Sequence, residues 1–351
     1  MNRSLRVRFR QLALLCAVCT IAAIAVGCGS GASHASPRPS TVSVALDWVP
    51  NTNHIGMYVA KALGYYRDAG IDVHILPYGT TAPETLVANR VADFGISYEA
   101  GTIFARAAGE DVVSVFAILQ HDALEVGIRS TNTSIRTAKD LDGKTYAGFG
   151  TPDEGPTLQY VIRRAGGNGR FTTVVLNSSA YDAVWSGNAD FTLSYTTWEA
   201  IQADLAGKPF KPGFTLQELG LPDNYSTLMI SSNSYLNAHP DIARRFLAAT
   251  QRGYAYAASH PDAAAAMLIA ADPSGLGSQR TLVTTSARLL ARSFLRDPAG
   301  TTGPQNTDMW AGYGNLLFHA GALQTSTGAR ITQQPVWSND YTNAYLPSGS
   351  P

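Results

Sequence analysis

The spacing of apolar residues along this chain alternates between the period of a strand and the period of a helix. Apolar and polar side chains alternate in some stretches, whereas in others apolar side chains recur every three or four residues. Strand spacing occurs at 42–46, 71–75, 94–97 and 112–119, and helical spacing occurs at 55–63 and from Pro83 onward. Strands that alternate with helices predict an α/β fold with a largely parallel sheet.

Two sequence motifs of the first half return in the second half in the same order. The segment ADFGISY at 92–98 reappears as ADFTLSY at 189–195, and YVAKALG at 58–64 reappears as YVIRRAG at 160–166. The two offsets, 97 and 102 residues, differ by five. This repetition predicts two α/β lobes built from one unit, with a loop of different length in each.

The first 27 residues have the layout of a lipoprotein signal peptide. Arginines precede a mostly apolar run from Leu12 to Val26, which is short for a membrane span but suits the core of an export signal. The run ends in Ala-Val-Gly-Cys at 25–28, which resembles a lipobox although Ala25 stands where Leu is usual. We therefore expect Cys28 to carry lipid and 28–41 to be a flexible tether, the alternative being an ordinary cleavage site beside a cysteine.

Charge and cysteine content exclude several classes of protein. The chain balances 26 basic against 26 acidic residues, which gives no reason to expect nucleic acid as a partner. All three cysteines lie at or before residue 28, so the mature chain has no pair for a disulfide. The seven histidines show no spacing typical of a metal site, and we expect neither a metal nor a cofactor.

Aromatic and polar side chains follow the predicted strands at their carboxyl ends, where parallel α/β sheets bind ligands. The stretch DWVPNTNH at 47–54 follows the first strand, and a loop at 148–160 takes the same place in the second lobe. That loop contains neither GxGxxG nor a phosphate-binding P-loop. Aromatic faces with carboxylate acceptors suit a flat, neutral or weakly basic heterocycle. The predicted ligand-binding residues are Trp48, Asn51, His54, Tyr98, Glu99, Glu154, Tyr195, Trp198 and Glu199.

The stretch LDWVPNTNHIGMYVAKALGYYRDAGIDV, together with ADFGISYEA, resembles the solute-binding proteins of ABC importers for thiamine-pyrimidine precursors. These proteins are related to sulfonate-binding proteins and to the fungal enzyme that makes the same pyrimidine, which NDYTNAYLP at 339–347 also resembles. The resemblance implies a type II periplasmic-binding-protein fold, with two α/β lobes joined by two crossing strands. It places 42–128 and 228–351 in lobe 1 and 129–227 in lobe 2.

The resemblance implies capture of a ligand without chemistry. The cysteine-rich iron site of the fungal enzyme is missing, since 225–230 reads YSTLMI, and Tyr98 and Thr102 occupy the positions of its essential Lys and His. We therefore expect a monomeric, lipid-anchored, extracytoplasmic binding protein that closes on an aminopyrimidine and docks on an ABC permease with its ATPase. Glu84 and Glu110 are candidate surface carboxylates for that docking.

Three other kinds of function remain open on the sequence alone, one of them a pair of sensor lobes that signals to a membrane partner. Within binding proteins, the ligand could be riboflavin or another flat ring system, or a sulfonate. From another class, the chain could be an extracytoplasmic enzyme that uses Glu154 and His54 as acid and base.

Overall fold

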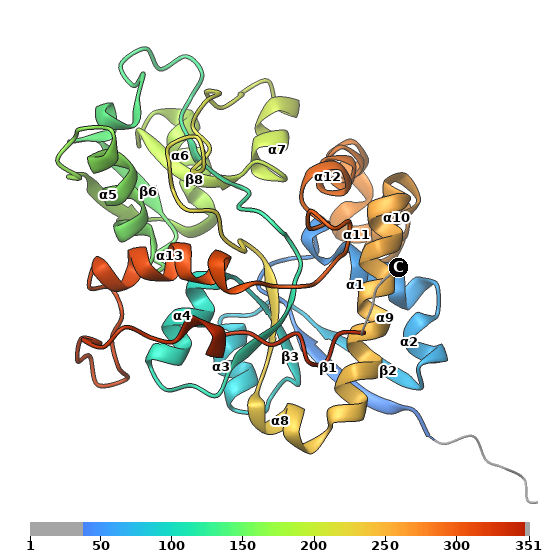
Figure 1. Cartoon of the computed structure of the whole chain (residues 1–351). Helices are drawn as coiled ribbons and strands as arrows, with labels where there is room; N and C mark the ends of the chain where they lie inside the picture. Colours follow the sequence, from blue (N-terminus) through green and yellow to red (C-terminus); the bar gives the residue numbers. More distant parts are fainter. Residues whose placement is uncertain (1–37, 348–351) are drawn as a thin grey trace, which may run out of the picture. The chain divides into compact units, whose positions relative to one another are not determined.

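The computed structural model describes residues 38–347, which contain two β-sheets with helices packed around them (Figure 1). The first sheet has five strands in the order β2-β1-β3-β9-β4. Strand β1 pairs in parallel with β2 and β3, whereas β9 runs antiparallel to β3 and β4. Its strands are β1 (Ser40–Ala45), β2 (Ile71–Leu76), β3 (Phe94–Ser97), β4 (Val113–Ala117) and β9 (Leu228–Ser231).

The second sheet has four strands and repeats the plan of the first. Its order is β5-β8-β6-β7, in which β6 is parallel to β7 and β8 while β5 is antiparallel to β8. Position by position, β6, β7, β8 and β5 correspond to β1, β2, β3 and β9. The strands are β5 (Leu124–Gly127), β6 (Thr145–Gly148), β7 (Thr172–Val175) and β8 (Phe191–Tyr195).

Strand register supports the repeat that the sequence predicts. Val44 lies opposite Phe94 in the first sheet, and Tyr146 lies opposite Phe191 in the second. Residue 146 stands 102 positions after 44, and 191 stands 97 after 94, which are the two offsets found between the repeated motifs. The helices of the other repeated motif both end next to a glycine with a left-handed backbone, Gly64 and Gly166, where other residues are strained.

The chain passes between the two sheets twice, before β5 and before β9. The lobe boundary differs from the one expected near residue 128, because 124–127 pairs with β8 and so belongs to the second sheet. Each sheet therefore receives its antiparallel strand from a segment that has just arrived from the other lobe. Two α/β lobes joined by two crossing segments agree with the predicted architecture.

Helices cover both sheets and connect their strands. The α-helices are α1 (Ile55–Ala62), α2 (Tyr65–Asp68), α3 (Pro83–Ala88), α4 (Glu99–Ala107), α5 (Glu154–Arg164), α6 (Ala180–Ser186), α7 (Glu199–Leu205), α8 (Asn233–Ala238), α9 (Pro240–Ser259), α10 (Pro261–Ala271), α11 (Pro273–Leu276), α12 (Arg280–Ser293) and α13 (Thr307–His319). Short 3-10 turns are η1 (Thr52–His54), η2 (Ala138–Leu141), η3 (Asn177–Ser179), η4 (Gly277–Gln279) and η5 (Trp337–Asn339). No helix within 38–347 combines the length and apolarity needed to cross a membrane.

Close packing of α1 against α9 holds the first ligand-binding loop in place. Gly253 of α9 approaches the backbone of Gly56 so closely that an added Cβ would lie 2.0 Å from the Gly56 oxygen. The neighbouring Tyr254 is buried, and its hydroxyl donates to the carbonyl of Asn53 at 2.7 Å. The C-terminal helices thus fix the loop that follows β1.

The C-terminal segment also reaches the second lobe through α13. This helix packs against α4 of the first lobe and α5 of the second (Figure 1). Beyond it, Asp340 pairs with Arg106 of α4, and Tyr341 forms a bridge with Ser114 of β4. The signal peptide, Cys28 and residues 28–37 of the expected tether lie outside the described residues.

Candidate functional site

A cleft of about 690 Å³ lies among the loops that follow the strands of both sheets. The first lobe contributes the loop after β1, the segment around Tyr78 and the start of α4. The second lobe contributes the loop after β6 and the end of β8. Seven of the nine predicted residues line it, namely Trp48, Asn51, Tyr98, Glu154, Tyr195, Trp198 and Glu199.

Asn51 organises the loop after β1 with both ends of its side-chain amide. Its Oδ1 accepts from the backbone N–H of Asn53 at 2.8 Å, which caps η1, and its Nδ2 donates to the carbonyl of Val49 at 3.2 Å. The backbone N–H of Asn51 in turn donates to Nδ1 of His54 at 3.3 Å. This reciprocal cap shapes the stretch DWVPNTNH and aims Trp48 into the cleft.

His54 is fully buried and does not line the cleft, contrary to its place among the predicted contacts. Because Nδ1 accepts from Asn51, the neutral ring carries its proton on Nε2, which lies 2.8 Å from Oδ1 of Asp47. Asp47 does line the cleft. The imidazole therefore positions a carboxylate that sequence reasoning passed over, although Asp47 directly precedes Trp48.

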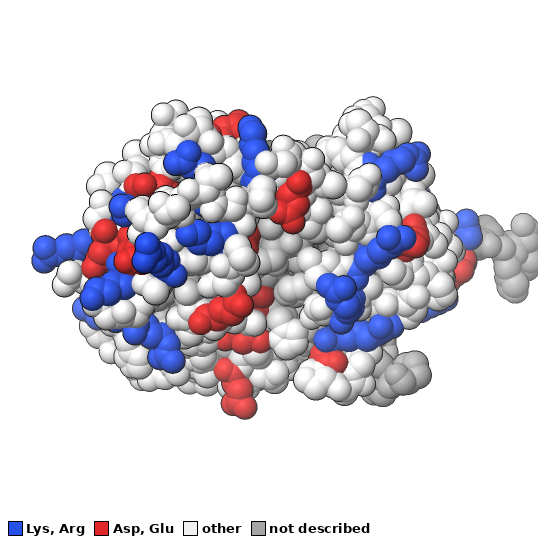
Figure 2. Space-filling model, turned by 90° about the horizontal axis from the view of Figure 1, so that it is seen from above, with Lys and Arg blue, Asp and Glu red and all other residues white. Residues whose placement is uncertain are grey.

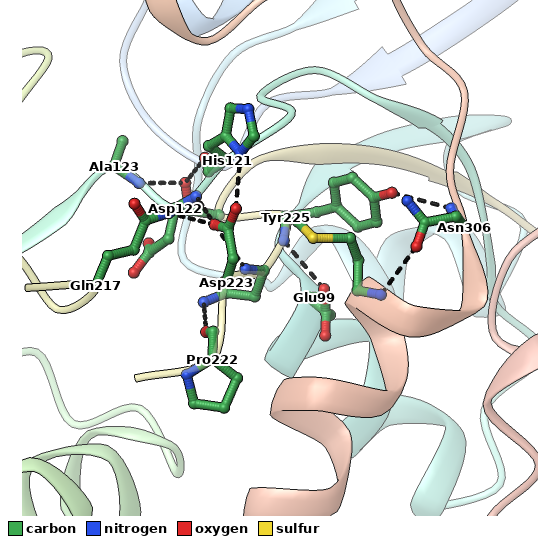
Figure 3. Close-up of polar contacts among 12 residues, drawn as sticks. Glu99, His121, Asp122, Ala123, Gln217, Pro222, Asp223, Tyr225 and Asn306 are labelled. Atoms are coloured by element: carbon green, nitrogen blue, oxygen red, sulfur yellow. Dashed lines mark hydrogen bonds and ion pairs between the residues drawn. The ribbon is translucent and has the colours of Figure 1, made fainter. Parts of the chain in front are cut away.

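Glu99 is also buried outside the cleft, at the segment where the chain returns to the first lobe. Its Oε2 accepts from the backbone N–H of Tyr225 at 3.0 Å, whereas within residues 38–347 its Oε1 has no hydrogen-bond partner (Figure 3). Burial raises the pKa of Glu99 well above its ordinary value. Glu99 fastens α4 to a crossing segment.

The two crossing segments are joined to each other by side chains near Glu99 (Figure 3). Asp223 accepts from the backbone N–H of Asp122 at 2.8 Å and pairs with Nδ1 of His121 at 2.7 Å. The hydroxyl of Ser226 accepts from the backbone N–H of Ala123 at 3.1 Å. Burial raises the pKa of Asp122 to about 7. Any rotation of the lobes has to be accommodated around this network.

Tyr98 reaches across the cleft from the first lobe to the second. Its hydroxyl lies 3.4 Å from Oδ1 of Asp153, which directly precedes α5, and Tyr313 of α13 approaches the other carboxylate oxygen at 3.5 Å. The Tyr313 hydroxyl also contacts Thr157 at 2.6 Å. Burial is the largest cause of the raised pKa of Asp153. Asp153 was not predicted, because its importance depends on residues 55 and 160 positions away.

The two predicted carboxylates of the second lobe each hold a nearby backbone segment. Glu154 accepts from the N–H groups of Phe149 and Gly150 at 2.8 and 3.1 Å. Glu199 accepts from the N–H of Tyr195 at 3.0 Å. Burial raises the pKa of Glu154 above its ordinary value and that of Glu199 to about 7. Both carboxyl groups thus line the cleft, and hydrogen bonds from the backbone fix their positions.

Aromatic side chains approach the cleft from both lobes. Trp48 and the exposed Tyr78 lie with ring centroids 5.1 Å apart on the first lobe, and Trp198 and Tyr195 belong to the second. The Tyr195 hydroxyl donates to the carbonyl of Ser226 at 2.9 Å, so its ring is the part that faces the cleft. The sequence did not point to Tyr78, because this residue follows β2 and belongs to neither of the two repeated motifs.

The charge of the cleft is entirely acidic. Among the described residues, six carboxyl groups and no Lys, Arg or His line it, and Figure 2 shows acidic side chains between two groups of basic ones. Two of the six, Glu84 and Glu110, were predicted to form a surface for a permease. Glu84 is instead buried, and its carboxylate accepts from the hydroxyl of Ser97.

The residues 38–347 hold no group of three or more His, Cys, Asp and Glu placed to bind a metal.

The chain resembles known proteins over most of its length. Residues 51–264 match the family described as NMT1/THI5 like. The chain is 26% identical over 308 residues to the formylaminopyrimidine-binding protein of Halalkalibacterium halodurans, with 86% of this chain and 91% of the relative covered. It is 28% identical over 247 residues to a 4-amino-5-hydroxymethyl-2-methylpyrimidine phosphate synthase of Legionella pneumophila, with 68% and 76% covered.

Among solved structures, the alkanesulfonate-binding protein SsuA of Xanthomonas axonopodis pv. citri has a TM-score of 0.65 at 17% identity. The match covers 87% of this chain and 99% of that one. This likeness confirms the predicted periplasmic-binding-protein fold.

Proposed function

Because the chain belongs to the NMT1/THI5-like family, we propose that it is the extracytoplasmic binding component of an ABC importer and that it captures an aminopyrimidine. The observation that carries this proposal is the acidic cleft between aromatic side chains of two lobes. Its charge suits a ligand that donates hydrogen bonds, and its aromatic faces suit a flat ring. The formylaminopyrimidine-binding relative supports the same ligand class.

Recognition in this proposal divides between stacking and hydrogen bonding. The ring of the ligand lies against Trp48 and Trp198, and its exocyclic amine donates to carboxylates that face the cleft. Asp47 and Glu199 are suited to that role because each is held by a partner, His54 in one case and the N–H of Tyr195 in the other. Oriented acceptors lose little freedom when the ligand binds.

The chain acts by retention, and the two groups that an enzyme would need are already engaged. His54 is buried with both ring nitrogens bonded, and Glu154 holds the N–H groups of Phe149 and Gly150. Neither can approach a substrate proton without breaking the loop that it organises. A lack of turnover with aminopyrimidines and pyridoxal phosphate supports this proposal, and product formation would contradict it.

A sulfonate ligand is disfavoured by the same charge. Binding an anion among six carboxyl groups, with no Lys, Arg or His from 38–347 at the cleft, is electrostatically unfavourable. The likeness to SsuA therefore extends to the fold and not to the cargo.

The test is calorimetry with 4-amino-5-hydroxymethyl-2-methylpyrimidine, comparing the wild type with Trp48→Ala. Removal of a stacking face should weaken binding about tenfold or more, since stacking adds roughly 0.5–1.5 kcal/mol beyond burial of the ring. Tyr345→Ala removes an aromatic ring outside the cleft and should leave affinity unchanged. Absence of binding to the wild type would refute the ligand class, and equal affinity of wild type and Trp48→Ala would refute the stacking.

Anchoring through Cys28 remains a prediction from the sequence. It requires the mature N-terminal peptide to carry lipid on Cys28, which mass spectrometry of the membrane fraction measures directly. An unmodified Cys28 there would remove the anchor from the proposal.

A further inference from the structure

A second pocket of about 330 Å³ lies beside the cleft, and the function proposed above does not use it. Its walls come from the loop after β1, from α6 and α7, and from α11 with the turn that follows. Trp48, Tyr181, Trp198 and Glu199 line both the cleft and this side pocket. A ligand in the cleft therefore meets the side pocket at these four residues.

Tryptophan is concentrated in the side pocket. Of the five tryptophans in the chain, all of which lie in the described part, three line it: Trp48, Trp185 and Trp198. The other two, Trp310 and Trp337, are buried in the core. Trp185 is stacked on Phe210 with centroids 6.0 Å apart, and Nζ of Lys208 lies 5.7 Å from its ring centroid. Its ring is therefore already engaged, and Trp48 and Trp198 are the indoles that offer a face to a ligand. Indole faces are the strongest cation acceptors among neutral side chains.

Carboxylates complete the side pocket, and no cationic side chain from residues 38–347 lines it. Asp182 is exposed on α6. Asp272 caps α11 by accepting from the N–H of Gly275 at 3.0 Å through Oδ1, which leaves Oδ2 for a ligand. Glu199 contributes from the side shared with the cleft. Tryptophan faces with negative groups around them form the environment in which proteins bind organic cations.

We propose that the side pocket binds a cationic group joined to the aminopyrimidine, so that the ligand consists of two parts. The inference rests on the proposed function, because it assigns the first part to the cleft. The two sites share Trp48, Trp198 and Glu199, so the link between the parts has to be short. Thiamine, in which one methylene joins an aminopyrimidine to a cationic thiazolium ring, has this chemistry and is the probe.

The experiment measures affinities of thiamine and of 4-amino-5-hydroxymethyl-2-methylpyrimidine by calorimetry and by quenching of tryptophan fluorescence. The wild type should bind thiamine about tenfold or more tightly than the pyrimidine, because the cation adds contacts with indole and carboxylate. The variant Asp182→Asn/Asp272→Asn should bind thiamine about tenfold more weakly and the pyrimidine unchanged. Asparagine still caps α11, so the variant keeps its fold.

Asp308→Asn is the matched control, because it removes an exposed carboxylate of α13 that lines neither site. It should change neither affinity. If the pyrimidine binds and thiamine binds no more tightly, the side pocket inference fails while the proposed function stands. The inference also fails if the double variant loses affinity equally for thiamine and for the pyrimidine. It fails likewise if the wild type binds uncharged riboflavin tightly and does not bind thiamine. If neither pyrimidine nor thiamine binds, both proposals fail.

Discussion

Ionisation of Glu199 should control ligand affinity near neutral pH. The carboxyl is 8% exposed and lines both the cleft and the side pocket, and burial raises its pKa to about 7. Below that value it carries a proton, and above it the carboxylate can accept from an amine with the strength of a charge-assisted hydrogen bond. Affinity for an aminopyrimidine should therefore increase as the pH rises through about 7.

The size of the effect follows from the pKa. If only the ionised form binds, the competent fraction increases from about one tenth at pH 6 to about nine tenths at pH 8. Affinity then increases about ninefold, which corresponds to about 1.3 kcal/mol. Ligand binding at pH 6 should also release close to one proton per site.

The perturbation is Glu199→Gln, which keeps an oxygen to accept from the N–H of Tyr195 and removes the charge. Calorimetry across pH 6–8 in buffers of different ionisation enthalpy gives affinity and proton release together. The ligand's own titration cancels in the ratio of wild-type to variant affinity. That ratio should grow about ninefold over this range, and a ratio that stays constant would refute the assignment of Glu199 as the titrating acceptor.

Two further predictions concern stability. The pKa of buried Asp122, about 7, exceeds its ordinary value near 3.8, so the contribution of Asp122 to stability is fully present below pH 3.8 and is lost as the pH rises through about 7. In thermal or urea unfolding, the free energy of unfolding of Asp122→Asn relative to that of the wild type should increase by about 2 to 3 kcal/mol between pH 5 and pH 8. Unfolding free energies of the two proteins that change in parallel with pH would contradict this. Gly253→Ala forces α9 away from the Gly56 oxygen and should cost about 1–3 kcal/mol. Gly277→Ala, where no atom lies within 4 Å of the added Cβ, is its control and should stay within about 0.5 kcal/mol of the wild type; equal effects would refute the packing argument.

Local sequence was sufficient to predict the strands and helices around the site. The stretch after β1 was recognised because Trp48, two amides and an imidazole are crowded into eight residues. The sequence could not predict the role of each residue in that stretch. Only the folded loop shows that Asn51 bonds to the backbone of Asn53 and that His54 bonds to Asp47. Glu99 was misjudged for a related reason, because a carboxylate at a helix start has the same local sequence whether it faces a ligand or a crossing segment.

What the sequence by itself determined was periodicity and repetition: alternating strands and helices, and two units offset by 97 and 102 residues. Apolar spacing dictates these features because each element must bury one face, whatever its neighbours are. The tertiary structure alone decided which carboxyl groups gather in one cleft and which tryptophans form the side pocket. Asp47, Asp153 and Glu199 come from distant segments of the chain and line one cleft only once the two lobes have folded. The burial that raises the pKa of Asp153 and of Glu199 likewise exists only in the folded protein.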